Sequence, residues 1–360
     1  MIKNITVDAR MINSSGIGTF IKNVLKRIIN IKKEWKFNII GNVEELSKFD
    51  FLNFDNVKLI DCRVPIYSIR EQFALLLAIP KDTDIFWSPH YNIPIFYTGK
   101  LVVTVHDVFH LAMPQFVKGI HKKIYSKFMF HMVKEKANKI IVVSKFTAKE
   151  LKRLVNVPEE KISVIYNGVD NEWFNIKYGK KVYHKPYILY VGNVKPHKNL
   201  ITLLKAFTKV KDRIEQDLII VGKKDGFITG DNRLNEFINN NEGRIIFTGF
   251  VENDILKQYY KQADIFVFPS LYEGFGLPPL EALAAGCKKI ICSDIPAIRE
   301  IYNNSILYFN PYDVNDISRI LIQVNNEKYL FPFSFSKYNW DIAVKKYEKV
   351  FENVCGGGIQ

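Results

Sequence analysis

Residues 264–286 read DIFVFPSLYEGFGLPPLEALAAG, and this stretch decides the fold of the second half of the chain. The apolar run that ends at Phe268 predicts a buried strand. Pro278 and Pro279 suit the first turn of a helix, where a missing N–H is not needed, and Gly286 suits the position just after the last turn. A strand, a glycine loop and a helix in this order form the repeating unit of a doubly wound α/β fold.

The loop between this strand and this helix is a candidate ligand site. Gly274 and Gly276 allow the backbone to approach a ligand closely, and the start of the following helix offers unpaired N–H groups to a phosphate. Two carboxylates frame the loop: Glu273 before the glycines, and Glu281 in what we expect to be the first helical turn. Carboxylates accept strong hydrogen bonds from sugar hydroxyls. Each Glu alone is also explained as a turn residue or as an acid at a helix N-terminus, but the combination favours a ligand site.

The same alternation of short apolar runs and amphipathic stretches extends over the whole chain. It predicts strands over residues 2–7, 36–40, 57–60, 85–87, 101–105, 139–143, 187–191, 217–221, 244–247, 265–268 and 288–292. It predicts helices over residues 19–31, 121–136, 145–154, 200–210, 232–239, 252–262, 279–285 and 340–353. The polar, irregular segment 169–186 separates two halves, and 360 residues exceed the usual size of one domain, so we expect two α/β domains.

Composition excludes disordered and membrane-spanning classes of protein. Hydrophobic residues make up 48% of the chain and charged residues 24%, which is an ordinary balance for a folded protein. The longest dense apolar run, residues 73–80, is too short for a membrane span and is expected to be a core element. The first residues run directly into a strand pattern, so no signal peptide is expected. The four cysteines form no CxxC pair, which favours a reducing compartment and argues against structural zinc.

The net charge of +14 is concentrated in one region of the first half. Between Lys118 and Arg153 there are 11 basic residues and only two acidic ones. Such a segment indicates an anionic partner, which could be nucleic acid, a phospholipid surface or a phosphorylated substrate, or else a merely solvated face. The helix expected over residues 121–136 has an apolar face made of Tyr125, Phe128, Met129, Met132 and Val133. That face either lies on an anionic leaflet or packs in the core.

The segment from Glu273 to Glu281 resembles the EX7E signature of retaining glycosyltransferases with the GT-B fold, and nearly the full chain resembles glycosyltransferase family 4, or group 1. Three further segments match in family order: YVGNVKPHKNL at 190–200, LIIVGK at 218–223 and IFTGFV at 246–251. The resemblance implies an α/β GT-B fold, with two doubly wound Rossmann-like domains facing across a cleft. It implies an acceptor-side domain over residues 1–170, a donor-binding domain over 171–335, and a C-terminal helix over 336–360 that packs back on the first domain.

The resemblance also assigns roles in the second domain. It implies that Glu273 binds hydroxyls of the donor sugar, that Glu281 binds the ribose, and that Lys198 neutralises the donor diphosphate. Further donor-binding residues implied by the match are Asn193, Gly249, Phe250, Val251, Gly274, Phe275, Gly276 and Leu277. Asn193 departs from the Arg that some members use as a second diphosphate contact, and Lys195 or Lys223 is a candidate to replace that Arg.

In the first domain, residues 15–19 read SGIGT between a strand and a helix. The sequence resembles the family loop that closes over the donor phosphate, which makes Gly16 and Gly18 donor-binding candidates, although a GxG alone also fits a tight turn. His106 ends an apolar strand and matches the family His that contacts the donor sugar, so we count it as catalytic together with Glu273 and Lys198. Asp107 is expected to orient the loop or to cap a helix.

The resemblance implies no metal and no cofactor, with a nucleotide-diphosphate sugar as co-substrate. Asp82 and Asp84 form the Asp-x-Asp pair that chelates a metal in the other large transferase fold, but their position before a strand favours a role at the strand entry. The implied activity is retaining transfer of a hexose, with mannose or rhamnose preferred, to a saccharide or lipid-linked saccharide in polysaccharide or glycolipid synthesis. The implied location is cytoplasmic, with residues 118–153 on the inner face of the plasma membrane. The alternatives are a nucleotide-sugar epimerase of the same fold, a pyridoxal-phosphate phosphorylase or a basic nucleic-acid-binding protein.

Overall fold

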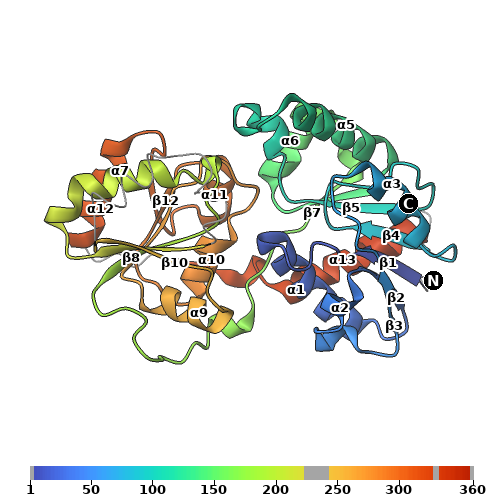
Figure 1. Ribbon diagram of the computed structural model, residues 1–360, viewed down its shortest axis with the longest axis horizontal. Coiled ribbons are helices and arrows are strands. Elements are labelled where there is room, and N and C mark those ends of the chain that lie inside the picture. Colours follow the sequence, from blue (N-terminus) through green and yellow to red (C-terminus); the bar gives the residue numbers. More distant parts are fainter. Residues whose placement is uncertain (1–3, 223–242, 327–331, 357–360) are drawn as a thin grey trace. The chain divides into compact units, whose positions relative to one another are not determined.

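A computed structural model describes residues 4–222, 243–326 and 332–356 of the chain (Figure 1). The helix expected over residues 232–239, and Lys223, lie outside these residues. The chain forms two compact units, Met1–Gly168 with Ser336–Gln360, and Val169–Phe335. Each unit contains one parallel sheet covered by helices, so the α/β class of doubly wound, Rossmann-like domains is confirmed.

The first unit is built on a seven-stranded parallel sheet with the order β3-β2-β1-β4-β5-β6-β7. Its strands are β1 Asn4–Asp8, β2 Lys36–Gly41, β3 Val57–Asp61, β4 Ile85–Ser88, β5 Leu101–Val105, β6 Lys139–Val142 and β7 Ile162–Val164. After β3 the chain returns to the middle of the sheet, and with right-handed crossovers the later helices then cover the other face. This switch in strand order places the carboxyl ends of β1 and β4 side by side, which is where open α/β sheets bind ligands.

The helices of this unit are α1 Ser15–Ile31, α2 Val43–Leu46, α3 Ile69–Ala78, α4 Phe109–Ala112, α5 Ile120–Lys136, α6 Lys145–Val155 and α13 Trp340–Cys355. Figure 1 shows α1 and α13 on one face of the sheet, and α3, α5 and α6 on the other. α1 begins before the predicted Thr19, because the backbone N–H of Gly18 already donates to the carbonyl of Ser14 at 2.8 Å. The glycines that we expected in a loop therefore lie in the first helical turns.

α13 comes from the far end of the chain and completes the core of the first unit. Trp340, Tyr347 and Phe351 are buried and pack with Phe20 of α1 and Trp87 of β4. The ring centroids of Trp87 and Tyr347 lie 5.4 Å apart. Burying one such ring contributes roughly 2–3 kcal/mol, so this helix supplies a substantial part of the stability of the first unit.

The apolar run over residues 73–80 is a core element only in part, because Leu75 and Ile79 are buried. It belongs to α3, whose Phe73 and Leu77 are exposed, whereas Glu71 is fully buried. Glu71 faces inward because it binds the buried guanidinium of Arg10 at 2.6 Å. The helix therefore buries Glu71 and Gln72 together with Leu75, and Phe73 and Leu77 are left on its outer face.

The second unit is built on a six-stranded parallel sheet with the order β10-β9-β8-β11-β12-β13. Its strands are β8 Tyr187–Val191, β9 Asp217–Val221, β10 Ile245–Gly249, β11 Ile265–Phe268, β12 Ile290–Ser293 and β13 Leu307–Phe309. Its helices are α7 Leu200–Val210, α9 Asn253–Gln262, α10 Leu277–Ala284, α11 Pro296–Tyr302 and α12 Val314–Asn326. Neighbouring β8 and β11 place the loops that follow them next to each other at the carboxyl edge of the sheet.

Single-turn 3-10 helices connect several of these elements. They are η1 Asp50–Leu52, η2 Pro114–Phe116, η3 Glu159–Lys161, η4 Asn171–Trp173, η5 Pro196–Lys198, η6 Lys211–Arg213 and η7 Phe335–Lys337. The sequence did not predict β7 and β13, which are three-residue strands at the edges of the two sheets. η5 ends at Lys198, one of the predicted site residues.

Candidate active site

Two loops bring a lysine and a glutamate together at the carboxyl edge of the second sheet. Lys198 ends η5 after β8, and Glu273 lies in the loop after β11. The Nζ of Lys198 donates to Oε1 of Glu273 at 2.5 Å. The backbone N–H of Leu271 donates to the carbonyl of His197 at 2.8 Å, which ties one loop to the other. Both charged side chains are partly buried, so solvent screens their attraction less than it would screen a surface pair.

The glycine loop has the backbone geometry that its sequence predicts. Gly276 has a φ of +88°, and an added Cβ would lie 2.5 Å from Cδ1 of Ile298. The hydroxyl of Tyr302 donates to the carbonyl of Gly276 and holds the turn in place. Pro278 and Pro279 occupy the first turn of α10 and lack an N–H, so the amides of Gly276 and Leu277 are the donors nearest the loop. This end of α10 is suited to an anion.

The C-terminal end of α10 confirms the role predicted for Gly286. Gly286 has a φ of +84°. Its N–H donates to the carbonyl of Leu283 at 3.0 Å, and the N–H of Cys287 donates to that of Ala282 at 3.0 Å. These two bonds are the pattern that closes a helix with a left-handed glycine.

Glu281 lies in a different place on α10 from the one we predicted. The helix begins at Leu277, so Glu281 is in its second turn and not its first. Its Oε2 accepts a hydrogen bond from the hydroxyl of Tyr260 at 3.0 Å. Burial raises the pKa of Glu281 to about 7, and the bond from Tyr260 opposes this shift only in part. A carboxylate with such a pKa is poorly solvated and gains from a ligand that brings hydroxyl donors.

Backbone contacts connect the loops after β8, β9 and β10 in a row. The N–H of Gly222 donates to the carbonyl of Gly249 at 3.0 Å. An added Cβ on Gly222 would lie 2.1 Å from the carbonyl oxygen of Gly192, so the loop after β9 needs glycine to approach the loop after β8. The candidates Asn193, Gly249, Phe250 and Val251 therefore share one edge of the sheet with Lys198 and Glu273.

Three buried hydroxyls along this edge have no hydrogen-bond partner among the described residues. They are Oη of Tyr190, Oγ of Ser270 and Oγ of Ser293. These residues belong to the ends of β8, β11 and β12, which are neighbours in the sheet. A buried hydroxyl without a partner costs about 1–3 kcal/mol, so such groups call for an ordered water or a polar ligand.

The first unit holds the remaining candidates. His106 follows β5, and its Nε2 hydrogen-bonds with the carbonyl oxygen of Pro89 at 2.9 Å. Burial lowers the pKa of His106, so its ring is neutral at physiological pH. The ring of Phe20 packs edge-on against it at 4.7 Å. Oδ1 of Asp107 accepts the N–H of Phe109, the first residue of α4, at 2.8 Å; because the N-cap position is Val108, Asp107 orients the loop just before the helix, the other of its two predicted roles.

Gly16 and Gly18 differ sharply in their surroundings. A Cβ added to Gly16 would meet nothing within 4 Å, whereas one added to Gly18 would lie 2.3 Å from the carbonyl oxygen of Ile12. Gly18 is therefore required for packing, and Gly16 is open to a ligand. The structure places these glycines and His106 in the first unit, and Lys198, Glu273 and Glu281 in the second.

Asp82 and Asp84 serve the entry of a strand. Oδ2 of Asp84 accepts the backbone N–H of Asn4 at 3.0 Å, and Oδ2 of Asp82 accepts its side-chain amide at 2.9 Å. Across residues 4–222, 243–326 and 332–356, no group of three or more His, Cys, Asp or Glu side chains is arranged to hold a metal.

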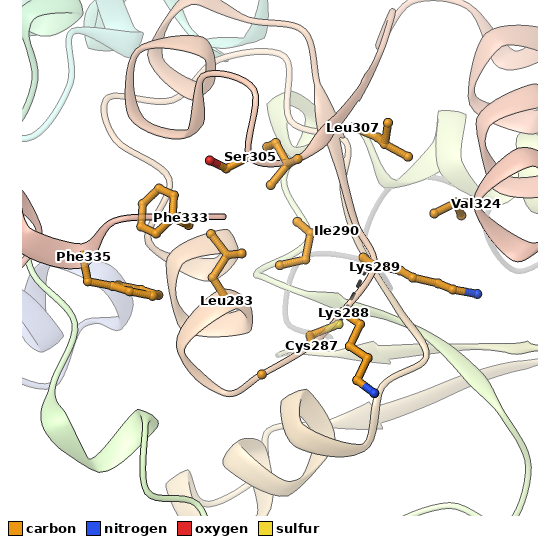
Figure 2. A pocket seen from close by; sticks show the side chains of 12 residues that line it. Leu283, Cys287, Lys288, Lys289, Ile290, Ser305, Leu307, Val324, Phe333 and Phe335 are labelled. Atoms are coloured by element: carbon orange, nitrogen blue, oxygen red, sulfur yellow. Dashed lines mark hydrogen bonds between the residues drawn. The ribbon is translucent and has the colours of Figure 1, made fainter. Parts of the chain in front are cut away.

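A hollow of about 230 Å³ in the second unit lies away from the glycine loop (Figure 2). It is lined by Ile290 and Leu307, the first residues of β12 and β13, and by Phe333 and Phe335. It therefore opens at the amino ends of these strands, whereas the candidate site is at their carboxyl ends. None of the candidate residues lines it.

Comparison with known proteins identifies the family. Residues 171–338 match the model of glycosyl transferases group 1, and residues 61–173 match that of glycosyltransferase family 4. The O-antigen chain mannosyltransferase RfbU of Salmonella typhimurium is 30% identical over 256 residues, which cover 71% of this chain and 67% of that protein. The chain belongs to the group 1 glycosyltransferases. The alignments with the first three curated relatives cover 59–67% of those proteins.

Solved structures place this group 1 glycosyltransferase in the GT-B fold. Sucrose-phosphate synthase from Thermosynechococcus elongatus has a TM-score of 0.76 and 16% identity, over 99% of this chain and 100% of that chain. HepE from Anabaena, in complex with UDP and glucose, has a TM-score of 0.68 and 13% identity, over 97% and 95% of the two chains. At these identities the likeness is one of fold. In the part of the glycosyltransferase that the structure describes, no helix has the length and apolarity of a membrane span.

Sequence reasoning missed the residues that support the site of this glycosyltransferase. Tyr260, which binds Glu281, and Tyr302, which holds Gly276, come from α9 and α11. Both tyrosines are fully buried, and in sequence they look like ordinary core aromatics of amphipathic helices. Only the fold brings the hydroxyl of Tyr260 to Glu281 and that of Tyr302 to the glycine loop, so no local sequence signal could have identified them.

Proposed function

We propose that this glycosyltransferase moves a hexose from a nucleotide-diphosphate sugar to a saccharide or lipid-linked saccharide, with retention of anomeric configuration. The observation that carries the proposal is the pair of Lys198 and Glu273, held 2.5 Å apart beside Gly276. A cation and a carboxylate match the two ends of such a donor, its diphosphate and its sugar hydroxyls. The name of RfbU supports mannose as the sugar and a role in cell-surface polysaccharide or glycolipid synthesis. Rhamnose is our second choice of sugar. The nucleotide and sugar bound to HepE support the class of donor.

In this proposal the ion pair exchanges partners when the donor binds. Lys198 turns to the diphosphate, and Glu273 accepts hydrogen bonds from the sugar, so each charge keeps a partner. The amides of Gly276 and Leu277 then help Lys198 to stabilise the negative charge that grows on the leaving diphosphate. We expect Glu281 to accept hydrogen bonds from the ribose, and the backbone at Gly249 to meet the base.

The proposal assigns retention to attack on the same face of the sugar. An oxygen of the leaving diphosphate takes the proton of the acceptor hydroxyl, while the new bond forms as the old one breaks. Glu273 and His106 position the sugar and do not attack it. Because Lys198 and backbone amides neutralise the diphosphate, the proposed reaction needs no metal or organic cofactor, and we expect turnover to persist in excess EDTA.

The unpartnered hydroxyls at the same edge support a polar, hydroxyl-rich ligand. Tyr190, Ser270 and Ser293 offer donors and acceptors that the described residues leave unused. A nucleic-acid-binding protein would have little use for Glu273 and Glu281 beside a phosphate site, since carboxylates repel phosphates.

Thermal-shift measurements with GDP-mannose, UDP-glucose and dTDP-rhamnose test donor binding. A donor at 100 times its Kd should stabilise the protein by about 2.7 kcal/mol. Lys198→Ala should lose this shift, while the exposed Lys205→Ala, also after β8, should keep it. Release of nucleoside diphosphate only with an acceptor supports transfer. A donor sugar converted to its epimer without an acceptor supports the epimerase. No shift with any of the three donors contradicts the proposal.

The outer face of α3 points to a place of action at a membrane. Ile69, Phe73 and Leu77 lie on one stripe of this helix, and Ile69 and Leu77 are each 85% exposed. The ring of Phe73 stacks on exposed Phe96 at 5.7 Å, which widens the apolar surface. Exposed apolar side chains gathered in this way mark an interaction site.

α5 carries a second exposed stripe, and it lies near the start of α3, since the ring of Tyr125 is 6.0 Å from that of Tyr67. Ile120, Ile124 and Phe128 are exposed on it, whereas Met129 and Val133 are buried. Met129 and Val133 of the predicted apolar face therefore pack in the core, which was one of its two alternatives. Phe128 of the predicted face is exposed together with Ile120 and Ile124, which the prediction did not include. The two stripes have six exposed side chains, and with Phe96 there are seven; we call these seven residues the α3–α5 face.

The charge around the α3–α5 face favours an anionic leaflet over a protein partner. Residues 118–136 carry six Lys and one acid, Glu135. Each basic residue near an anionic leaflet contributes about 1 kcal/mol, and the apolar side chains insert between headgroups. We propose that this face docks on the cytoplasmic side of the plasma membrane, where a lipid-linked acceptor is presented.

Sedimentation with vesicles tests the docking. The protein should bind phosphatidylcholine vesicles that contain about one-third phosphatidylglycerol, and bind pure phosphatidylcholine far less. The double variant Ile69→Gln, Leu77→Gln should lose most of this binding, and so should Lys123→Gln, Lys127→Gln. Ile255→Gln, an exposed apolar residue in the second unit, is the control. Equal binding to both vesicles, or full binding by both double variants, contradicts the proposal.

A further inference from the structure

A group of aromatic rings in the first unit is arranged in an unusual way. Tyr67, Tyr91, Tyr125 and His90 form a cluster in which the ring of Tyr67 lies 5.8 Å from His90, 6.0 Å from Tyr125 and 6.4 Å from Tyr91. We call these four residues the tyrosine rim. His90 and Tyr91 follow β4, so the rim lies past the carboxyl end of that strand, at the ligand-binding edge of the sheet.

The backbone of Tyr67 is strained. Its φ is +67°, a left-handed conformation that a bulky side chain rarely adopts. Such a residue costs on the order of 1–3 kcal/mol and persists where the surroundings hold it for a reason. The residue as a whole is 48% exposed, so it is not buried tightly enough for core packing alone to hold this conformation.

A buried set of charges holds Tyr67 in this position. Oε2 of Glu71 accepts the backbone N–H of Tyr67 at 2.8 Å. The other carboxylate oxygen of Glu71 binds Arg10 at 2.6 Å, and Arg10 also binds Asp8 at 2.6 Å. Glu71 also lies in the first turn of α3, capped by Ser68, but capping alone does not require a buried guanidinium or a strained neighbour.

The rim also contains a polar group that is ready for a ligand. Nδ2 of Asn92 is buried and has no hydrogen-bond partner among the described residues. Oδ1 of the same residue accepts a bond from the hydroxyl of Tyr125, so the amide lies at the rim. The backbone N–H of Asn92 donates to Nδ1 of His90 at 3.2 Å, and Nε2 of His90 faces the hydroxyl of Tyr67 at 3.2 Å.

The charge of the rim selects the kind of ligand. Burial, helped by the charges of His106, His110 and Arg10, lowers the pKa of His90 to about 3, so its ring is neutral. The single guanidinium of Arg10 is already matched by the two carboxylates of Asp8 and Glu71. Among the described residues of the rim and its support by Arg10, Asp8 and Glu71, no positive charge is left unmatched for an anionic group.

We propose that the tyrosine rim binds a neutral hexose unit of the acceptor, with Tyr67 stacked on the sugar ring and the amide of Asn92 bound to a hydroxyl. Aromatic faces suit the apolar C–H face of a sugar, and the nearby hydroxyls and amide suit its edge. The assignment rests on the proposed transfer to a saccharide. Tyr125 of the rim is adjacent to Ile124 of the α3–α5 face, so a sugar in the rim would lie close to the proposed lipid surface.

Saturation-transfer NMR on the full chain tests the rim without any donor. The probes are methyl α-mannopyranoside, methyl α-glucopyranoside, methyl α-galactopyranoside and, as an anionic probe, methyl α-glucuronide. We expect signals from at least one neutral glycoside and none from the glucuronide. Tyr67→Asn should weaken binding about tenfold, as expected for loss of roughly 1.4 kcal/mol, and should keep the fold because Asn tolerates a positive φ. Tyr67→Phe should bind as the wild type does.

Two controls separate this proposal from the function of the donor site. Phe54→Asn removes a similarly exposed ring elsewhere in the first unit and should change nothing. Glu273→Gln should leave glycoside binding intact, and Tyr67→Asn should leave the thermal shift with the donor intact. Any one of three results overturns the proposal. Tyr67→Asn binds glycosides as the wild type does, the wild type binds the glucuronide more strongly than the neutral glycosides, or the wild type binds no neutral glycoside. If the wild type shows no thermal shift with any donor but still binds a neutral glycoside, the donor site is refuted and the rim is not.

Discussion

Replacement of Glu281 by Gln tests the electrostatic environment of the candidate site. Glu281 lies in the second turn of α10 and accepts a hydrogen bond from buried Tyr260. Gln has the same shape and keeps an oxygen that can accept this bond. The substitution therefore removes one titrating group and little else.

The structure fixes the sign and the size of the effect. Burial raises the pKa of Glu281 from 4.5 to about 7. Between these values the folded protein holds a proton that the unfolded chain releases, so the stability from this group is complete below pH 4.5 and is lost as the pH rises through 7. Since one pKa unit corresponds to about 1.4 kcal/mol, the shift from 4.5 to about 7 lowers the free energy of unfolding by at most about 3–4 kcal/mol. Glu281→Gln should lack this fall and should exceed the wild type in stability at about pH 8.

Urea unfolding of the nucleotide-free protein at several pH values between about 5 and 8 measures the effect. Because the two units need not unfold together, the unfolding transition of the second unit should be monitored separately from that of the first. Glu215→Gln, at an exposed position of the same unit, is the matched control and should follow the wild-type curve. Parallel pH curves for the wild type and Glu281→Gln would show that the carboxylate is well solvated and that our reasoning is wrong.

Four further substitutions test other parts of the structure. Lys198→Ala should lower acceptor-dependent release of nucleoside diphosphate about 10²–10³-fold, and turnover within twofold of the wild type would refute its role. Gly276→Ala should lower the melting temperature of the second unit, because it combines a φ of +88° with a 2.5 Å approach to Ile298; an unchanged melting temperature would refute this. In the first unit, Gly18→Ala should destabilise α1, whereas Gly16→Ala should stabilise it by roughly 0.5–1 kcal/mol, and the reverse order in thermal unfolding would contradict the packing described.

The sequence predicts central strands well and edge strands poorly. Residues 101–105 and 187–191 were predicted with the bounds that β5 and β8 have, because strands covered by helices on both faces are almost entirely apolar. β7 and β13 have only three residues and lie at the edges of their sheets. Ile162–Val164 is half-buried throughout, so its apolar signal is too short to stand out from a loop.

Local chemistry misled the prediction where glycine and apolar residues serve the tertiary structure. The glycines near Ser15 suggested a loop, but Gly18 is needed for α1 to pass the carbonyl of Ile12. The apolar residues 73–80 suggested a core throughout, but the buried Arg10 requires Glu71 on the inner face of α3, so Phe73 and Leu77 face outward while Leu75 stays buried. In both cases a tertiary contact, with the carbonyl of Ile12 or with Arg10, decides how the helix is placed.

In the candidate site, too, local features could be predicted from the sequence and contacts between distant residues could not. The glycine loop and the helix after it are one continuous stretch, so the sequence predicted the turn at Gly276 and the C′ role of Gly286. The pair of Lys198 and Glu273 joins residues 75 positions apart, and only the order of β8 and β11 brings them together. The tyrosine rim gave no sequence signal, because a positive φ at Tyr67 follows from the fold and not from the residue type.

The place of α13 bears on how the protein is made. Trp340 and Tyr347 complete the core around Phe20 and Trp87, yet they are synthesised after the whole second unit. A chain that ends at residue 335 contains the whole second unit, while its first unit still exposes aromatic surface. Such a chain is prone to aggregate and is a natural client for chaperones. Ribosome stalling or a stop codon shortly before Trp340 would therefore abolish the amino-terminal unit, although every strand of that unit had already been translated.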